Sequence, residues 1–324
     1  MIDPKEVDIL KGALDTMSAA WSDLPPFDQD LDWKAITAVL EQTAEHMRDN
    51  YPYAHPLYAG QMLKPPHPVA RLAYALSLWV NPNNHALDGG RASSAMEKSV
   101  IPRIGAMWGW DHCLGHLTGG GTMANLEALW VAGKLHPGNK VVASSQAHYT
   151  HSRLTEVLGI PFEPVDVTAS GHMDVDHLET LLAGGEVGTV VATMGTTGLG
   201  AVDPLPDILA LQERYGFRIH ADAAYGGYFG LSSLLAEGPR AAFDALGRVD
   251  SVVIDPHKHG LQPYGCGSVL FRDSSVGRYY QHGSPYTYFS SSELHLGEIS
   301  LECSRPGAAA VALWATMELL PLDA

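Results

Sequence analysis

Val252-Val253-Ile254-Asp255-Pro256-His257-Lys258 is a short apolar run that ends abruptly in charged residues and a proline. The three β-branched residues predict a buried strand, and Pro256 prevents it from continuing inside a sheet. A lysine just beyond a buried strand is partly desolvated, which favours the neutral, nucleophilic amine over the ammonium. Such an amine reacts with carbonyl groups such as aldehydes. A solvated surface lysine is the alternative, and Lys258 alone does not decide between the two.

Short β-like runs alternate with segments of helical periodicity from about residue 113 onward. This alternation predicts an α/β fold with a mostly parallel sheet. In such sheets ligands bind beyond the carboxyl ends of the strands, where Lys258 is expected. The predicted strands are 140–143, 189–194, 217–221, 251–254 and 267–271. The predicted helices are 122–134, 151–158, 175–183, 204–215 and 305–319.

The first part of the chain has a different character. Residues 5–20 and 31–49 carry apolar side chains at helical spacing, and prolines are frequent between the two segments and after the second. We predict an N-terminal helical arm over residues 1–60 and a large domain that holds the chemistry over residues 61–324.

Composition excludes several classes of function. The 324 residues carry a net charge of −16, and no Lys/Arg-rich run supplies the basic face that nucleic-acid binding needs. The longest apolar stretch, around 69–80, contains Arg71 and is too short to span a bilayer, so we expect no membrane association. Three widely spaced cysteines predict neither a disulfide framework nor a metal site, and we expect a reducing, cytoplasmic location.

Asp222 ends a second apolar run, 217–221, and small residues follow it. A buried carboxylate at this position can keep a pyridine nitrogen protonated, and only the protonated ring is an effective electron sink. Ala224 is small enough to let a planar ring approach the backbone. The alternative is an aspartate that only caps a helix.

Gly119-Gly120-Gly121-Thr122 precedes the predicted helix 122–134. Backbone N–H groups at a helix start bind phosphate, and glycine allows the anion to approach closely. The loop is not a Walker motif, because no Gly-Lys-Ser/Thr follows. It is not a dinucleotide fingerprint, because the GxGxxG spacing and a strand immediately before it are both missing. A tight turn without a ligand is the alternative.

Two further loops follow predicted strands. His148 comes soon after strand 140–143, and an imidazole there can stack on a flat ring and transfer protons near neutral pH. His148 and His151 could instead bind a metal, but a third ligand at regular spacing is missing, so we expect no metal. Thr196, in the turn after strand 189–194, offers a hydroxyl to a cofactor or substrate.

The phosphate loop, stacking histidine, threonine turn, aspartate and lysine occur in an order known from one enzyme family. The chain resembles the group II pyridoxal-dependent amino acid decarboxylases, which act on aromatic amino acids, glutamate, histidine, tyrosine or aspartate. The resemblance runs from about His55 to the C-terminus. The motifs that carry it are Gly-Gly-Thr-Met-Ala-Asn-Leu (120–126), Gln-Ala-His (146–148), His-Ala-Asp-Ala-Ala-Tyr (220–225) and Asp-Pro-His-Lys (255–258).

The resemblance implies the fold-type-I large domain of pyridoxal 5′-phosphate (PLP) enzymes, with a mostly parallel seven-stranded sheet. It implies a PLP cofactor bound as a Schiff base to Lys258, with Asp222 at the pyridinium nitrogen and His148 stacked on the ring. These three residues would be catalytic. The cofactor-binding residues that it implies are Gly120, Gly121, Thr122, His148, Thr196, Asp222, Ala224, His257 and Lys258.

The resemblance also implies a homodimer in which the N-terminal arm lies over the partner, and a substrate mouth lined by His55 and Ser93. Arg91 stands where relatives often have a proline, and its guanidinium could pair with a substrate carboxylate or with an acid across the dimer. We therefore expect α-decarboxylation of an L-amino acid with an acidic or aromatic side chain. A carbon–carbon lyase resembling sphingosine-phosphate lyase and an inactive PLP-binding homologue remain alternatives.

The sequence stops at Ala324, soon after the predicted helix 305–319. In the family that the chain resembles, a small C-terminal domain and a catalytic loop follow this point. We therefore expect both to be absent from this sequence.

Overall fold

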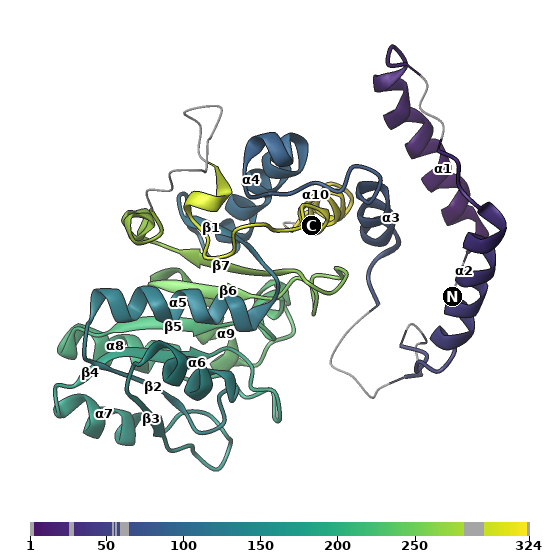
Figure 1. Ribbon diagram of the computed structural model, residues 1–324. Coiled ribbons are helices and arrows are strands. Elements are labelled where there is room, and N and C mark those ends of the chain that lie inside the picture. The colour runs from purple at the N-terminus through teal and green to yellow at the C-terminus, as the bar shows by residue number, and fades with distance from the viewer. Residues whose placement is uncertain are drawn as a thin grey trace. The chain divides into compact units, whose positions relative to one another are not determined.

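One seven-stranded sheet organises the chain from Pro66 onward (Figure 1). The strand order is β1-β7-β6-β5-β4-β2-β3; neighbours from β6 to β3 run parallel, and β7 is antiparallel to both β6 and β1. The predicted α/β class with a mostly parallel seven-stranded sheet is confirmed. The strands are β1 (Leu114–Thr118), β2 (Lys140–Ser144), β3 (Phe162–Val165), β4 (Val187–Thr193), β5 (Arg218–Asp222), β6 (Ser251–Ile254) and β7 (Gly267–Phe271).

The computed structural model describes residues 3–25, 29–53, 55, 57–58, 65–281 and 295–322. Contacts divide the chain into two compact units, an N-terminal segment (Met1–Pro65) and a sheet unit (Pro66–Ala324). The two units are described separately below.

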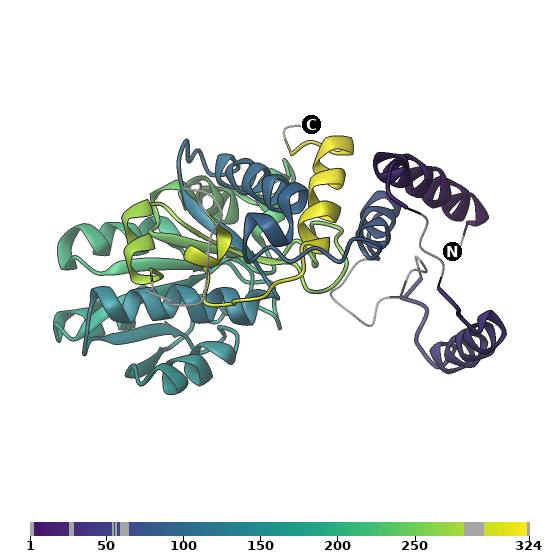
Figure 2. The ribbon, with the colours of Figure 1, turned by 45° about the horizontal axis from the view of Figure 1, so that its top comes forward.

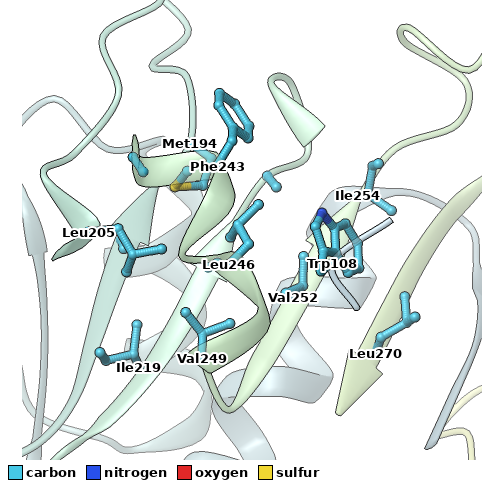
Figure 3. Close-up of a cluster of buried hydrophobic side chains, with 14 of the residues drawn as sticks. Trp108, Met194, Leu205, Ile219, Phe243, Leu246, Val249, Val252, Ile254 and Leu270 are labelled. Carbon is cyan, nitrogen blue, oxygen red and sulfur yellow. The ribbon is translucent and has the colours of Figure 1, made fainter. Parts of the chain in front are cut away.

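Each central strand places alternate side chains on the two faces of the sheet. In β6, Val252 and Ile254 join the larger apolar cluster, and Val253 joins a cluster on the other face. Figure 3 shows Val252 and Ile254 in the larger cluster together with Leu246 and Trp108. Because both faces of β6 are buried, Val252, Val253 and Ile254 form a continuous apolar run and do not alternate with polar residues.

Helices cover both faces of the sheet. α5 packs against β5, β6 and β7 on the face of the smaller cluster, whereas α4, α8 and α10 contribute apolar residues to the larger one. α3 and α10 are far apart in sequence and lie side by side (Figure 1, Figure 2). The helices described in the sheet unit are α3 (Pro68–Ser77), α4 (Arg91–Ala106), α5 (Gly121–Leu135), α6 (Thr150–Leu158), α7 (Val175–Ala183), α8 (Leu205–Tyr215), α9 (Glu237–Asp244) and α10 (Ala308–Leu319). Short 3₁₀ turns are found at Leu87–Gly89, Gly227–Leu231, Leu246–Arg248, Ser274–Tyr279 and Leu296–Glu298.

The sequence does not predict β1, and this strand corrects the interpretation of the glycine loop. β1 lies immediately before Gly119, so the expectation that no strand precedes the loop is wrong. The strand is hard to recognise because it contains a glycine and His116. That histidine is buried 3.0 Å from the carboxylate of Glu127 on α5, so a polar side chain occupies a core position. β3 also escapes prediction, because it is an edge strand that contains Pro164.

The N-terminal segment contains two helices, as the periodicity of residues 5–20 and 31–49 predicts. Asp3 and Asp32 cap them by accepting backbone N–H bonds. Neither helix has a buried residue. In both units, none of the described helices is long and apolar enough to cross a membrane. The elements of this segment are α1 (Pro4–Ser18), a 3₁₀ turn (Ala19–Trp21) and α2 (Trp33–Met47).

Candidate active site

Loops at one edge of the sheet unit converge on a cavity of about 570 Å³. They follow the carboxyl ends of β1, β2, β4, β5 and β6, the edge at which an α/β sheet binds ligands. The residues that line the cavity are Gly119, Gly120, Gly121, Thr122, Met123, Asn125, Leu126, His148, Thr150, Leu154, Thr193, Gly195, Thr197, Asp222, Ala224, Tyr225, Asp255, His257, Lys258, Tyr264 and Glu302.

Lys258 follows β6 in a turn that its own N–H closes by donating to the carbonyl of Asp255 (2.9 Å). Its Nζ lies 3.0 Å from Oδ2 of Asp255, and 19% of the lysine side chain is exposed. Burial raises the pKa of the Asp255 carboxyl group, although Lys258 and His257 oppose the rise. The lysine amine therefore lies in the cavity beside a buried acid that can exchange a proton with it.

Asp222 is the last residue of β5, and its carboxylate is buried. Oδ2 lies 2.8 Å from Nε2 of His151, and Oδ1 accepts the N–H of Ala224 (3.1 Å). Burial alone would raise the pKa of Asp222, but the hydrogen bonds from His151 and from the N–H of Ala224 hold it below its usual range. Asp222 is therefore an anion at neutral pH, as the partner of a pyridinium nitrogen must be.

His148 lines the cavity from the loop between β2 and α6. Its Nδ1 lies 2.9 Å from Oγ1 of Thr150, which restrains the ring. Burial lowers the pKa of His148, and Asp222 opposes the fall. The ring is therefore neutral at neutral pH, and it can stack on a flat ring or accept a proton.

The three glycines and Thr122 form the start of α5. Gly120 has a φ of 149°, a conformation that favours glycine. A Cβ at Gly121 would lie 2.6 Å from Oδ2 of Asp255, so the loop passes very close to the buried acid. The N–H groups of the first helical turn have no intrahelical acceptor and carry the positive end of the helix dipole. This end of the cavity is suited to an anion such as phosphate.

Ala224 and His257 line the cavity, and Thr196 does not. Nδ1 of His257 lies 2.9 Å from the carbonyl oxygen of Cys266, and burial lowers the pKa of this histidine. The hydroxyl of Thr196 accepts the N–H of Ala201 (3.0 Å) within its own turn, and the neighbouring Thr197 lines the cavity. A contact between Thr196 and a cofactor stays a prediction.

The residues predicted at the substrate mouth belong to different parts of the chain. Ser93 is buried in α4, where its hydroxyl bonds the side chain of Asn84. Arg91 is the first residue of α4 and is exposed. Neither lines the cavity. His55 is exposed and belongs to the N-terminal segment, so the roles of all three stay predictions.

Three side chains of this site were not foreseen in their observed roles. His151 bonds Asp222, although its spacing from His148 suggested only a metal ligand. Asp255 lies against Lys258, and Glu302 accepts the N–H of Gly119 (3.3 Å) at the rim. In the sequence, only the spacing of His148 and His151 indicated that His151 lies near the site, since it places both imidazoles near the start of α6. Among the described residues, no three potential metal ligands converge.

The cavity fits PLP at three points. The start of α5 can receive the phosphate, ionised Asp222 can pair with the pyridine nitrogen, and Lys258 can bond the aldehyde. All three line the same cavity. The close approach of Gly121 to Asp255 leaves no room there for a side chain, so the glycine lets the loop pack against the buried acid at the wall of the cavity.

Comparison with known proteins agrees with this fit. The pyridoxal-dependent decarboxylase conserved domain matches residues 54–320. A probable L-tyrosine/L-aspartate decarboxylase of Methanothermobacter thermautotrophicus is 31% identical over 263 residues, which are 80% of this chain and 70% of the relative. An L-aspartate decarboxylase of Thermococcus kodakarensis is 29% identical over 289 residues, which are 88% of this chain and 73% of the relative.

Solved structures share the fold. The structure of mouse CSAD matches with a TM-score of 0.80 at 22% identity and covers 99% of this chain and 76% of that chain. A sphingosine-1-phosphate lyase of Burkholderia pseudomallei matches with a TM-score of 0.74 at 18% identity, over 94% and 73% of the two chains. Because the family match spans most of the sequence, this chain belongs to the pyridoxal-dependent decarboxylases, carboxy-lyases that use PLP as their cofactor.

Proposed function

We propose that this site removes the α-carboxylate of an acidic L-amino acid, with L-aspartate as the preferred substrate. The observation that carries the proposal is the convergence of Lys258, Asp222 and the start of α5 on one cavity. PLP, when bound, would supply an aldehyde for the substrate amino group and a pyridinium ring for the electron pair that stays on the α-carbon when CO₂ departs.

In this proposal Lys258, Asp255 and Asp222 have separate roles in binding the cofactor and handling charge. Lys258 Nζ is the point of covalent attachment for the cofactor. Asp255 Oδ2, 3.0 Å away, takes up and returns the proton of that amine. Asp222 stays ionised and stabilises positive charge at the ring nitrogen, which lowers the energy of the electron-rich transition state.

The cavity walls position the ring and the phosphate. His148 and Ala224 line the cavity and would hold the two faces of the ring, and His148, neutral at neutral pH, would serve as a base for proton transfer at the substrate carbon. The residues proposed to hold the phosphate end are Gly120, Gly121 and Thr122, with His257 beside them.

The assignment of L-aspartate as substrate is supported by the names of two relatives and by the positive charge of Arg91. Both relatives described above carry L-aspartate in their names. Arg91 is exposed at the start of α4 and does not line the cavity, so in this proposal its guanidinium meets the substrate's side-chain carboxylate outside that lining, through two parallel hydrogen bonds. L-Tyrosine is the alternative substrate that the name of the first relative suggests.

We further propose a cytoplasmic homodimer in which residues 1–60 form an arm that contacts the partner. The support is the exposure of large apolar side chains on α1 and α2. The cysteines are free thiols, which is typical of a reducing compartment.

The test is an assay of CO₂ release from L-aspartate, L-glutamate, L-tyrosine and L-tryptophan by the PLP-loaded protein. We expect L-aspartate to be the best of the four. Lys258→Ala should abolish both the borohydride-trapped PLP adduct and CO₂ release. A clear preference for an aromatic substrate would contradict the acidic assignment while leaving the reaction class intact.

The structural likeness to a sphingosine-1-phosphate lyase makes carbon–carbon cleavage the second candidate. A lyase of this kind releases an aldehyde from a β-hydroxy amine and no CO₂. Aldehyde release without CO₂ would favour this candidate. A trapped adduct with neither product would point to a homologue that binds PLP without turnover.

A further inference from the structure

His151 contacts Asp222 from a different element of the fold. It is the second residue of α6, and its Nε2 lies 2.8 Å from Oδ2 of Asp222 at the end of β5. The exposed fractions are 1% for His151 and 6% for Asp222, so water cannot replace this contact.

The two oxygens of Asp222 have separate donors. Oδ1 accepts the backbone N–H of Ala224, and Oδ2 receives its hydrogen bond from His151. Of the described residues, His151 provides the one side-chain hydrogen bond that Asp222 receives. Together the two donors fix the plane of the carboxylate, and the ring-facing lone pairs remain for a ligand.

The tautomer of His151 follows from its surroundings. Nδ1 is buried and has no hydrogen-bond partner among the described residues. An imidazolium would leave a buried N–H unpaired at this atom, which is costly. The tautomer with its proton on Nδ1 would set a lone pair of Nε2 against the carboxylate. The neutral ring with its proton on Nε2 is the form that fits.

We propose that His151 is a positioning residue that orients the carboxylate of Asp222 toward the ring nitrogen of the cofactor and keeps it ionised. The inference rests on the proposed function, in which Asp222 pairs with a pyridinium ring. Burial alone favours the neutral acid, and a neutral Asp222 could not stabilise a proton on the ring nitrogen. The donor from α6 offsets this effect.

The test compares His151→Leu, which removes the donor, with His151→Gln, which keeps an N–H donor on a side chain of similar reach. Each protein is loaded with PLP labelled with ¹⁵N in the ring, and the ¹⁵N chemical shift and the Kd for PLP are measured. We expect the wild type and His151→Gln to show a protonated ring nitrogen. His151→Leu should shift toward the unprotonated value and bind PLP about tenfold more weakly or worse.

Thr155→Val is the matched control on the same helix. Thr155 is fully buried one turn beyond His151 and donates to the carbonyl of His151 without touching Asp222. It should leave the ¹⁵N shift unchanged. Thermal unfolding of all apo proteins separates a loss of fold from a loss of positioning, and His151→Met replaces His151→Leu if the latter does not fold.

A ring nitrogen that stays protonated, with unchanged PLP affinity, in a folded His151→Leu or His151→Met protein would overturn the proposal. A failure of the proposed function has a different signature. In that case the wild-type protein itself would form no borohydride-trapped adduct at Lys258.

Discussion

Gly121 and Asp255 are neighbours where the glycine loop passes the end of β6. A Cβ at Gly121 would lie 2.6 Å from Oδ2 and 3.1 Å from Oδ1 of Asp255, whose carboxylate is buried and cannot swing into solvent. We predict that Gly121→Ala displaces this carboxylate from Lys258. The variant should lose about 1–3 kcal/mol of unfolding free energy. It should bind PLP about tenfold more weakly, which corresponds to about 1.4 kcal/mol. Urea denaturation and PLP titration measure the two effects.

Gly238→Ala is the control for this substitution. Gly238 lies in α9, and a Cβ there would meet no atom within 4 Å. Alanine is favoured over glycine in helices by up to about 1 kcal/mol, so this variant should match or slightly exceed the wild type in stability. Wild-type PLP affinity in Gly121→Ala would contradict the close approach of the loop to Asp255.

Site residues are predictable from the sequence when they end an element and unpredictable when they act through a neighbour. Lys258 and Asp222 each follow an apolar run, so their place at the sheet edge could be inferred. His151 meets Asp222 across 71 positions of sequence, and the contact depends on how the start of α6 meets the end of β5. Thr197 lines the cavity where Thr196 was expected, because the rotation of a tight turn is not encoded in residue type.

At the scale of elements, His220 links three of them. It lies on β5, with Nε2 2.8 Å from Oδ1 of Asn125 on α5 and Nδ1 2.9 Å from Oγ of Ser251 on β6. Burial lowers the pKa of His220 to about 3. The folded protein therefore keeps this histidine neutral over a pH range in which the unfolded chain protonates it.

We predict that His220 makes the apo protein less stable as the pH falls from about 6.5 to about 3. In this range the unfolded state binds the proton and the folded state does not, so the free energy of unfolding rises with pH. The slope from one such group is at most about 1.4 kcal/mol per pH unit. His220→Gln should lose this slope, so the difference between the wild-type and variant free energies of unfolding, measured by urea denaturation at a series of pH values, should rise with pH over this range.

The difference curve is needed because other groups titrate in the same range. Burial raises the pKa of Asp203 to about 6, which gives the opposite sign and is common to both proteins. His112→Gln, which removes an exposed histidine, should follow the wild-type curve. A pH dependence of His220→Gln parallel to that of the wild type would refute the assignment.

Helices and strands, like site residues, are predictable from the sequence when their contacts are local and are missed when their contacts are remote in sequence. β6 and α7 are predicted to the residue because apolar neighbours cover them. α4 is missed because the first half of its buried face is polar, with Ser93, Ser94 and Glu97, and its buried apolar residues begin only at Val100. The carboxylate of Glu97 accepts from Arg305 (2.9 Å), 208 positions away. A helix whose buried partners are this remote gives only a weak periodic signal.

At the scale of the whole molecule, the two units differ in how they bury apolar surface. The sheet unit has continuous apolar clusters on both faces of its sheet, whereas α1 and α2 have no buried residue. Along α2, Trp33, Leu40 and Met47 are 67%, 62% and 63% exposed. They recur every seven residues and so share one face of the helix. An apolar stripe of this kind supports the proposed contact of this segment with another chain.

We predict that Leu40→Glu weakens the proposed homodimer by about tenfold or more, because burying a leucine contributes about 1.5–3 kcal/mol and 1.4 kcal/mol is a factor of ten. Sedimentation equilibrium at a series of concentrations measures the effect.

Gln42→Glu adds the same charge on the opposite face of α2 and should leave the equilibrium unchanged. Equal weakening by both substitutions would mean that charge alone acts, and a wild type that is monomeric at micromolar concentration would remove the dimer from the proposal. Because α2 contributes no residue to the cavity lining of the sheet unit, each variant should still form the borohydride-trapped adduct at Lys258.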